Sequence, residues 1–223
     1  MKKILGLILI ILIVLLIHFK NIDNDIYYLA LGDSYSVGVT PYNGQDYGFT
    51  DYVKDYLTSN NKLEKYIKDF SKSGYRTIDL LRDIEDNKTI IINGEEVSIQ
   101  QALIKADLVT LSIGTNDIIN VSSIALDNSY VIEVMNDMEN LLSLIRKYCK
   151  EKIITIGYLN NSENYKIASE KYKQLCEKYD IIYIDSSELL NDFKYFPNPN
   201  NIHPSKEGYE IIANEIISNL QFW

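Results

Sequence analysis

Short apolar runs alternate with longer segments of helical spacing along most of this chain. The apolar runs predict strands at Ile26–Leu31, Tyr66–Phe70, Asp107–Ile113, Lys152–Gly157 and Ile181–Asp185. Apolar residues spaced by three and four predict helices at Phe49–Leu57, Thr77–Ile84, Ile99–Ala106, Tyr130–Tyr148, Asn164–Tyr179 and Ser205–Leu220. Strands that alternate with helices are typical of a parallel sheet covered on both faces. The pattern predicts an α/β fold, with a flavodoxin-like, doubly wound sheet of about five strands.

One segment does not fit this alternation. Residues 89–97 contain two short runs of strand-forming residues around Asn93-Gly94. Asn-Gly between apolar runs favours a type I′ turn, which joins two antiparallel strands. We therefore expect a local hairpin, inserted outside the main sheet.

The first 20 residues are typical of a membrane segment. Lys2 and Lys3 precede Ile4–Ile17, in which only Gly6 is not strongly apolar. A basic start followed by an apolar run indicates an export signal, and no small-residue cleavage site follows it. An uncleaved signal anchor is therefore preferred over a cleaved, secreted form, with the domain outside the cytoplasm. We expect an anchor at residues 1–20, a polar linker at 21–25 and one domain at 26–223.

Charge and cysteine content limit the classes of partner and site. The formal net charge is −9, and the first 20 residues hold three lysines and no acid, which leaves −12 on the rest. Nucleic-acid binding needs a basic surface, so we expect no nucleic-acid partner. Cys149 and Cys176 lack CxxC spacing, and two buried thiols are expected, with a single bridge as the alternative. The domain has one histidine and scattered acids, so neither a metal nor another cofactor is expected.

Polar motifs follow two of the predicted strands. Gly32–Ser36 follows the first strand, and Gly114–Asp117 follows the strand at Asp107–Ile113. Ligands bind at the carboxyl ends of the strands in open parallel sheets, so both motifs fall where a site is expected. Ser34 is a candidate nucleophile there, but a serine hydroxyl reacts well only when a base takes its proton.

His203 is the one imidazole available as that base, because His18 lies at the edge of the membrane segment. Its unperturbed pKa suits proton transfer near neutral pH. Acyl transfer also needs hydrogen-bond donors at the carbonyl oxygen. The candidates are the backbone N–H groups of Ser34 and Gly74 and the side-chain amide of Asn116. Each has a structural alternative, as a helix cap or a turn glycine. We expect Asp33 and Asp117 to hydrogen-bond nearby backbone amides.

Four blocks combine these residues in one order: Gly32-Asp33-Ser34-Tyr35-Ser36, Gly74, Gly114-Thr115-Asn116-Asp117 and His203-Pro204. In order and spacing they resemble the SGNH (GDSL-type) esterase/lipase family, over Ile26 to Leu220. The resemblance implies a three-layer α/β/α sandwich, the SGNH hydrolase fold. By position it implies that Ser34 is the nucleophile and His203 the base. It also implies an oxyanion hole formed by Ser34 N–H, Gly74 N–H and Asn116 Nδ2.

The sequence departs from the family where an aspartate usually stands three residues before the histidine, because this chain has Asn200 there. In a serine protease, replacing the orienting aspartate by asparagine lowers turnover about 10⁴-fold. Three interpretations remain open. The enzyme could use a Ser–His dyad with a backbone carbonyl holding the ring, or another acid such as Asp185 or Asp192, or it could be an impaired catalyst.

The resemblance implies a serine ester hydrolase that works outside the cytoplasm through an acyl-enzyme on Ser34. Its substrate would be a small acyl ester, a lipid ester or an acetylated glycan, and the N-terminal segment would attach it to the membrane. The alternative is a catalytically impaired surface module of the same fold that binds glycan. A nucleotide-binding flavodoxin-like protein is disfavoured, because no glycine-rich phosphate loop opens a helix.

Overall fold

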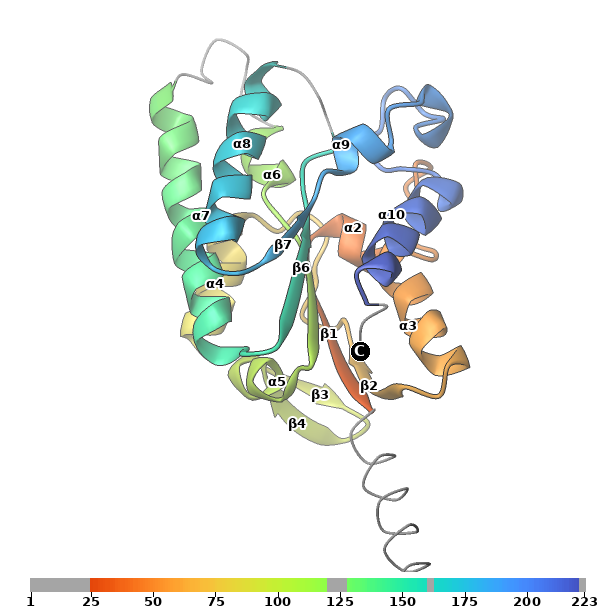
Figure 1. The fold of residues 1–223 in the computed structure, drawn as a ribbon, viewed down its shortest axis with the longest axis vertical. Coiled ribbons are helices and arrows are strands. Elements are labelled where there is room, and N and C mark those ends of the chain that lie inside the picture. Colours follow the sequence, from red (N-terminus) through yellow and green to blue (C-terminus); the bar gives the residue numbers. More distant parts are fainter. Residues whose placement is uncertain (1–24, 120–127, 160–162, 221–223) are drawn as a thin grey trace, which may run out of the picture.

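A five-stranded parallel sheet forms the centre of the molecule (Figure 1). The computed structural model describes residues 25–119, 128–159 and 163–220. The strand order is β2-β1-β5-β6-β7. The strands are β1 (Ile26–Gly32), β2 (Leu63–Ile67), β5 (Leu108–Ser112), β6 (Lys152–Ile156) and β7 (Ile182–Ile184). The predicted doubly wound α/β sheet is confirmed.

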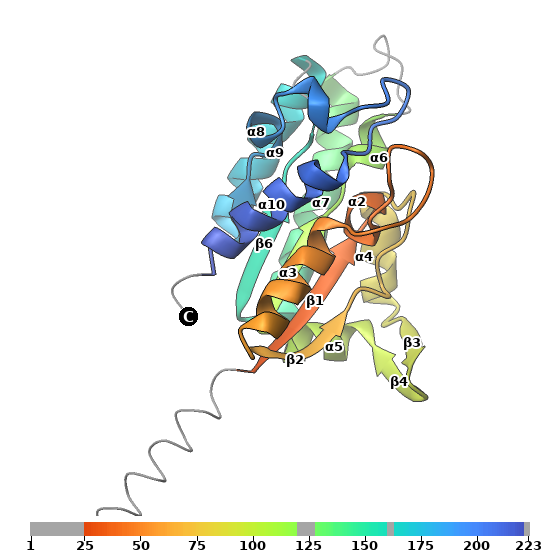
Figure 2. The same cartoon turned by 90° about the vertical axis from the view of Figure 1, so that its right-hand side faces the viewer.

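Helices cover both faces of the sheet, which gives three layers (Figures 1 and 2). One face packs against α3 (Phe49–Ser59) and α10 (Lys206–Ser218). The other packs against α4 (Thr77–Glu85), α5 (Ile99–Lys105), α7 (Asn128–Tyr148) and α8 (Glu163–Lys178). Side chains of β1 alternate between the two cores, because successive residues of a strand point to opposite faces. Tyr28 and Ala30 enter the first core, and Leu29 and Leu31 the second.

Single helical turns follow several strands where the sequence predicted loops or nothing regular. They are α2 (Ser34–Val37), α6 (Thr115–Ile118), α9 (Ser186–Leu189) and the 3₁₀ turn η1 (Phe193–Tyr195). Four residues are too few to show helical spacing. Side-chain caps at their starts stabilise three of these turns: Asp33 caps α2, Asp185 caps α9 and Asp192 caps η1.

The predicted hairpin is confirmed as a separate two-stranded sheet of β3 (Thr89–Ile92) and β4 (Glu95–Ser98). Its turn residues Asn93 and Gly94 have φ values of 52° and 85°. A type I′ turn needs positive φ at both central positions, which asparagine and glycine tolerate best.

The second strand differs from the prediction. β2 begins at Leu63, three residues before the expected start, and Phe70 lies buried in the turn after it. β2 pairs with β1 from Ile26↔Leu63 to Leu29↔Ile67 at the edge of the sheet. Edge residues are only partly covered, so Lys65 and its neighbours lack the apolar run that marks a central strand.

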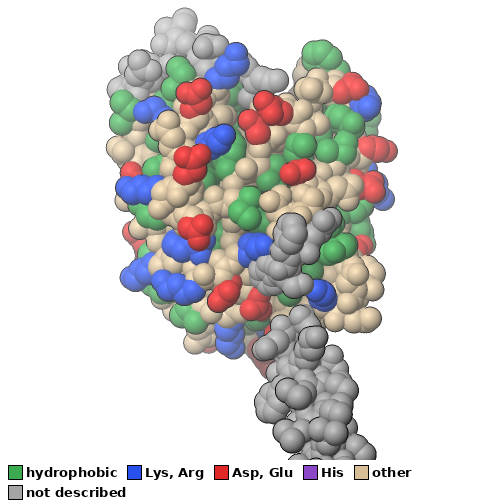
Figure 3. Space-filling view, in the orientation of Figure 1, with side chains coloured by type: hydrophobic (Ala, Val, Ile, Leu, Met, Phe, Trp, Pro, Cys, Tyr) green, Lys and Arg blue, Asp and Glu red, His purple; other side chains and the backbone are tan. Residues whose placement is uncertain are grey.

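Cys149 and Cys176 are both buried free thiols, so the alternative of a bridge between them is wrong. Burial raises the pKa of both. On the face seen in Figure 3, acidic and basic side chains are interspersed, without a continuous basic patch. No helix in the described ranges is both long and apolar enough to cross a membrane. The predicted anchor at residues 1–20 lies outside the described residues.

Candidate active site

The local backbone fixes Ser34 at the carboxyl end of β1, as the first residue of α2. Gly32 has φ +135°, and a Cβ there would lie 2.0 Å from the Ser112 carbonyl oxygen, so β1 and β5 approach too closely for any side chain. Asp33 then caps α2. Its Oδ1 accepts hydrogen bonds from Tyr35 N–H (3.1 Å) and from the Ser112 hydroxyl (2.8 Å). Ser34 is therefore held on a rigid turn at the predicted ligand edge.

His203 reaches Ser34 from the other end of the chain. Its Nε2 lies 2.8 Å from Ser34 Oγ. The ring is half-buried in the loop before α10, and the Tyr35 ring packs edge-on against it with centroids 5.5 Å apart. Burial lowers the pKa of His203 below its ordinary value of 6.5. The imidazole is therefore neutral at neutral pH, as a general base must be.

Asn201 determines which ring nitrogen of His203 carries the proton. Asn201 Oδ1 accepts the backbone N–H of His203 (2.9 Å), and because a backbone N–H can only donate, the atom facing it is the amide oxygen. The same oxygen lies 2.6 Å from His203 Nδ1, so Nδ1 donates to it. Nε2 then carries a lone pair that accepts the Ser34 hydroxyl proton.

The prediction for Asn200 is corrected here, because the residue that holds the imidazole is Asn201. Asn200 is exposed, and its backbone N–H donates to Asn198 Oδ1 (3.1 Å). Asn198 and Asn201 each accept the N–H two residues later, a pattern typical of Asx turns. The second turn places the Asn201 oxygen beside the ring of His203. Asparagine two residues before a histidine is the sequence signal that could have identified it.

The acidic alternatives, Asp185 and Asp192, are engaged elsewhere. Asp185 caps α9 and accepts the Ser187 hydroxyl (2.7 Å). Asp192 caps η1 and forms an ion pair with Lys194 (3.2 Å). The interpretation in which a backbone carbonyl holds the ring is replaced by the Asn201 amide.

The other predicted oxyanion residues lie at the same edge of the sheet, Gly74 in a loop and Asn116 in the helical turn α6. Gly74, with φ +84°, is exposed in the loop after β2, and that loop joins β1 through Lys72 N–H and Gly32 O (3.0 Å). Asn116 Nδ2 donates to Tyr75 O (2.8 Å), which places this amide beside the residue that follows Gly74. Ser34 N–H lies in the first turn of α2, where N–H groups have no partner within the helix.

Asp117 connects α6 to the start of α4 by hydrogen bonds, as expected for a structural residue. Its carboxylate accepts Thr77 N–H (3.0 Å) and the Thr77 hydroxyl (3.1 Å) at the start of α4. Burial raises the pKa of Asp117 to about 6. Burial also raises the pKa of Asp33 to about 7, and Asp33 Oδ2 has no hydrogen-bond partner among the described residues.

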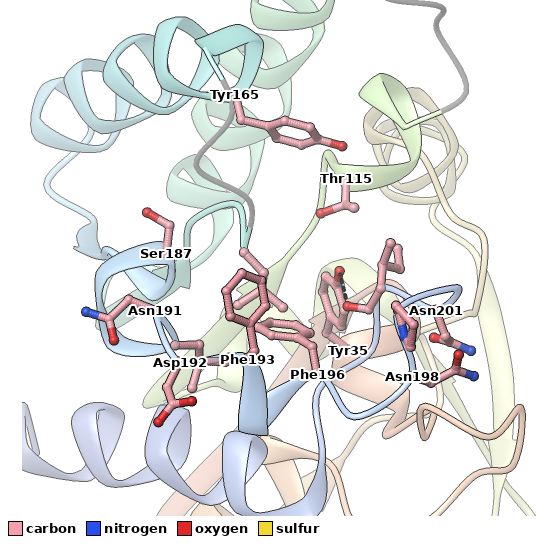
Figure 4. Close-up of a pocket in the computed structure, with 14 residues that line it drawn as sticks. Tyr35, Thr115, Tyr165, Ser187, Asn191, Asp192, Phe193, Phe196, Asn198 and Asn201 are labelled. Carbon is pink, nitrogen blue, oxygen red and sulfur yellow. Dashed lines mark hydrogen bonds between the residues drawn. The ribbon is translucent and has the colours of Figure 1, made fainter.

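A cavity of about 520 Å³ lies near this site, lined in part by residues next to Ser34 and His203 in the chain (Figure 4). Tyr35 and Asn201, which contact His203, are part of its wall. The rest comes from Leu159 after β6, from α6, α8 and α9, and from the segment between α9 and α10. Within the described ranges, no group of three or more His, Cys, Asp and Glu side chains could hold a metal ion.

Solved structures similar to this chain include esterases and lipases. The lipase Lip_vut3 from a goat rumen metagenome is 21% identical with a TM-score of 0.66, covering 86% of this chain and 95% of its own. Axe2, an acetylxylan esterase from Geobacillus stearothermophilus, is 18% identical with a TM-score of 0.65, covering 88% and 94%. The esterase EstA from Pseudoalteromonas sp. is 15% identical with a TM-score of 0.62, covering 90% and 98%. At this identity the likeness establishes the SGNH hydrolase fold.

A sequence search of curated proteins found no match. The model of the GDSL-like lipase/acylhydrolase family matches residues 30–211, a range that includes Ser34, Gly74, Asn116 and His203. That range is most of the chain, and the resemblance seen in the four sequence blocks is confirmed. The chain thus belongs to the GDSL-like lipase/acylhydrolase family and is a carboxylic ester hydrolase.

Proposed function

We propose that this enzyme hydrolyses carboxylic esters outside the cytoplasm, through an acyl-enzyme on Ser34, with His203 as the base and Asn201 as the residue that positions it. The observation that carries this proposal is the continuous chain of hydrogen bonds from Ser34 Oγ to His203 Nε2 and from Nδ1 to Asn201 Oδ1. Nucleophilic serine catalysis requires this order of groups.

In the acylation step, Ser34 Oγ attacks the ester carbonyl carbon while its proton passes to His203 Nε2. Negative charge develops on the carbonyl oxygen, where Ser34 N–H, Gly74 N–H and Asn116 Nδ2 donate hydrogen bonds. The imidazolium then protonates the leaving alkoxide oxygen, and the C–O bond to the alcohol breaks. Deacylation repeats these steps with water as the nucleophile and releases the acid and free Ser34.

The neutral amide of Asn201 gives this triad a distinct electrostatic character. It orients the imidazole and fixes the tautomer, as an aspartate would, but adds no negative charge to stabilise the imidazolium. Asn201 Nδ2 donates to Asn43 Oδ1 (3.0 Å), which keeps the amide oxygen toward the ring. Burial lowers the pKa of His203, and the neutral amide adds no charge that would raise it.

The substrates proposed are small acyl esters, lipid esters or acetylated glycans. The family assignment supports the ester, and the likeness to an acetylxylan esterase supports an acetylated glycan as one form of it. The catalytically impaired alternative makes the opposite prediction, because a module that only binds glycan needs no reactive serine.

Covalent labelling tests the nucleophile. We expect a fluorophosphonate probe to modify the full chain, and modification to be lost in Ser34→Ala and strongly reduced in His203→Ala. Ser59→Ala, at the exposed end of α3, is the matched serine control and should label like the wild type. Labelling that persists in Ser34→Ala, or is absent from the wild type, would contradict the proposal.

The location is proposed from residues 1–20, with two lysines before an apolar run. In a bacterial host, the full chain should sediment with membranes, and protease added to spheroplasts should digest the hydrolase domain. A soluble, protease-protected domain would contradict this location and leave the chemistry at Ser34 unaffected.

A further inference from the structure

The walls of the cavity beside Ser34 and His203 are mainly ring faces and aliphatic side chains. Tyr165 of α8 points into the cavity toward Thr115 of α6, and the rings of Phe193, Phe196 and Tyr35 lie on the opposite side (Figure 4). The remaining apolar lining residues are Leu159, Leu190, Pro199 and Ile202. Such a surface recognises a ligand by removing apolar area from water.

Several polar side chains around the cavity already have hydrogen-bond partners within the protein. Asn198 Nδ2 donates to Pro41 O (2.8 Å), and the Ser187 hydroxyl donates to Asp185 (2.7 Å). Asn201 is engaged with His203 on its oxygen and with another side chain on its nitrogen. These three side chains therefore have fewer groups left to replace the water that hydrates a sugar hydroxyl, and the remaining polar lining residues are Thr115, Tyr165, Asn191 and Asp192.

The charged groups also disfavour an anionic ligand. Among the described residues that line the cavity there is no lysine or arginine. The carboxylate among these described residues, Asp192, is paired with Lys194 and points away from the open space (Figure 4). A ligand carboxylate or phosphate would thus meet no counter-charge there.

Residues directly next to Ser34 and His203 in the chain line the cavity. Tyr35 directly follows Ser34, packs against the His203 ring, and donates its hydroxyl to Ile202 O (3.3 Å). Tyr35, Ile202 and Asn201 are all lining residues, so the cavity lies within reach of one end of an ester bound at Ser34. At about 30 Å³ for each water-sized atom, a volume of about 520 Å³ holds roughly 17 non-hydrogen atoms, far more than an acetyl group.

We propose that this cavity binds an unbranched aliphatic chain of the ester substrate, so that the enzyme prefers esters with a chain of roughly six or more carbons. This inference rests on the proposed function, since it assumes that Ser34 is the nucleophile. The chain can belong to the acyl half or to the alcohol half of the ester. The chemistry of recognition is the same in both, and two substrate series distinguish them.

The experiment measures kcat/KM of the full chain for p-nitrophenyl esters from acetate to decanoate, and for n-alkyl acetates from ethyl to octyl. We expect one series to rise by about fourfold for each added methylene until the cavity is full. A rise in the first series identifies the acyl chain as the occupant, and a rise in the second identifies the alcohol chain. A flat or falling profile in both series overturns the proposal.

Two variants test whether the dependence of kcat/KM on chain length arises in this cavity. Leu159→Trp should fill space and move the optimum to shorter chains, and Phe196→Ala should lower the ratio of octyl to acetyl rates at least fivefold. Tyr42→Ala removes an aromatic ring that is 72% exposed and outside this cavity, and should leave the profile unchanged. Equal profiles in Leu159→Trp, Phe196→Ala and the wild type would overturn the proposal.

The failure of this inference differs from the failure of the proposed function. Fluorophosphonate labelling of Ser34 and hydrolysis of p-nitrophenyl acetate, without any chain-length dependence, overturn the cavity assignment alone. Competitive inhibition by xylobiose, abolished in Phe196→Ala, overturns it in favour of a glycan. Absence of both labelling and hydrolysis overturns both proposals.

Discussion

The two regions that meet at the active site are built in different ways. Ser34 is held by the backbone at the end of β1, where Gly32 touches the Ser112 carbonyl and Asp33 caps a buried turn. His203 is held in an irregular loop, mainly by the side-chain amides of Asn198 and Asn201. The sheet therefore fixes the position of Ser34, the proposed nucleophile, whereas a small set of neutral hydrogen bonds fixes His203, the proposed base. Substitutions in the first region should affect stability, and those in the second should affect the rate.

The largest effect is expected from Gly32→Ala. A methyl group there would lie 2.0 Å from a backbone oxygen at φ +135°, and we expect the free energy of unfolding to fall by more than about 3 kcal/mol. Gly94→Ala is the matched control, because φ is +85° but a Cβ meets nothing within 4 Å. It should cost about 1–2 kcal/mol. Urea unfolding midpoints compare the two, and equal midpoints would show that close packing does not fix the nucleophile turn.

Asn201→Ala should affect the rate and not the fold. Without the amide oxygen, Nδ1 of His203 loses its acceptor and the imidazole samples other orientations and the other tautomer. We expect kcat to fall about 100-fold with little change in KM. The unfolding midpoint should move far less than in Gly32→Ala. A large loss of stability at an unchanged kcat would reverse the comparison between the two regions.

Asn201→Asp tests whether a negative charge beside His203 would increase the rate. A carboxylate beside Nδ1 favours the imidazolium, so the pKa of His203 should rise, kcat should increase about tenfold, and the acidic limb of the pH–rate profile should move to higher pH. Asn43 is exposed and can rotate its amide to donate to the new carboxylate. Asn200→Asp adds the same charge at an exposed neighbour and is the control. Equal shifts in both variants would contradict direct contact through residue 201.

Asp33→Asn tests the buried region through its pH dependence. Burial raises the pKa of Asp33 to about 7, above its unfolded value of 3.8, so the folded protein binds more protons than the unfolded chain between these values. This group then makes folding less favourable as pH rises from about 4 to 7, by up to about 1.4 kcal/mol per pH unit. The free energy of unfolding of Asp33→Asn, relative to the wild type, should rise across that window and level off above it.

Asp117→Asn is the companion variant, because burial raises the pKa of Asp117 to about 6. Its advantage should level off about one pH unit earlier than that of Asp33→Asn. Denaturant unfolding at pH 5, 6, 7 and 8 measures both. A difference from the wild type that is constant over this range would show that neither carboxyl changes its protonation on folding there.

The fold could be predicted well, because burial of the central strands produces long apolar runs. β1, β5 and β6 are buried along most of their length, and their predicted ranges agree with the structure to within one residue. The edge strand β2 was placed three residues late, because its half-exposed residues carry little signal. The hairpin was predictable because Asn93-Gly94 has few alternatives to a tight turn.

The site could be predicted only in part. Residues held by the sheet could be predicted, and residues held by side-chain hydrogen bonds in a loop could not. Ser34 and Asn116 follow central strands directly, so the sheet determines where they lie. The contact of Asn201 with His203 depends on two consecutive turns made by side-chain amides. The family's spacing from the histidine favoured Asn200 as the residue that orients the ring, whereas the turn places Asn201 beside His203 Nδ1. Local side-chain hydrogen bonds of this kind leave no periodic pattern in a sequence.

The direction of β1 has a consequence for how the enzyme meets its substrates. The chain enters this strand at Ile26 and leaves it toward Ser34, so the strand length separates the two, roughly 20 Å for seven residues (Figure 1). An anchor before Ile26, as proposed, would hold the catalytic edge turned away from the bilayer that carries it. Such an enzyme would act on esters that diffuse freely or that lie on a surface opposite its own membrane, and not on esters within that membrane.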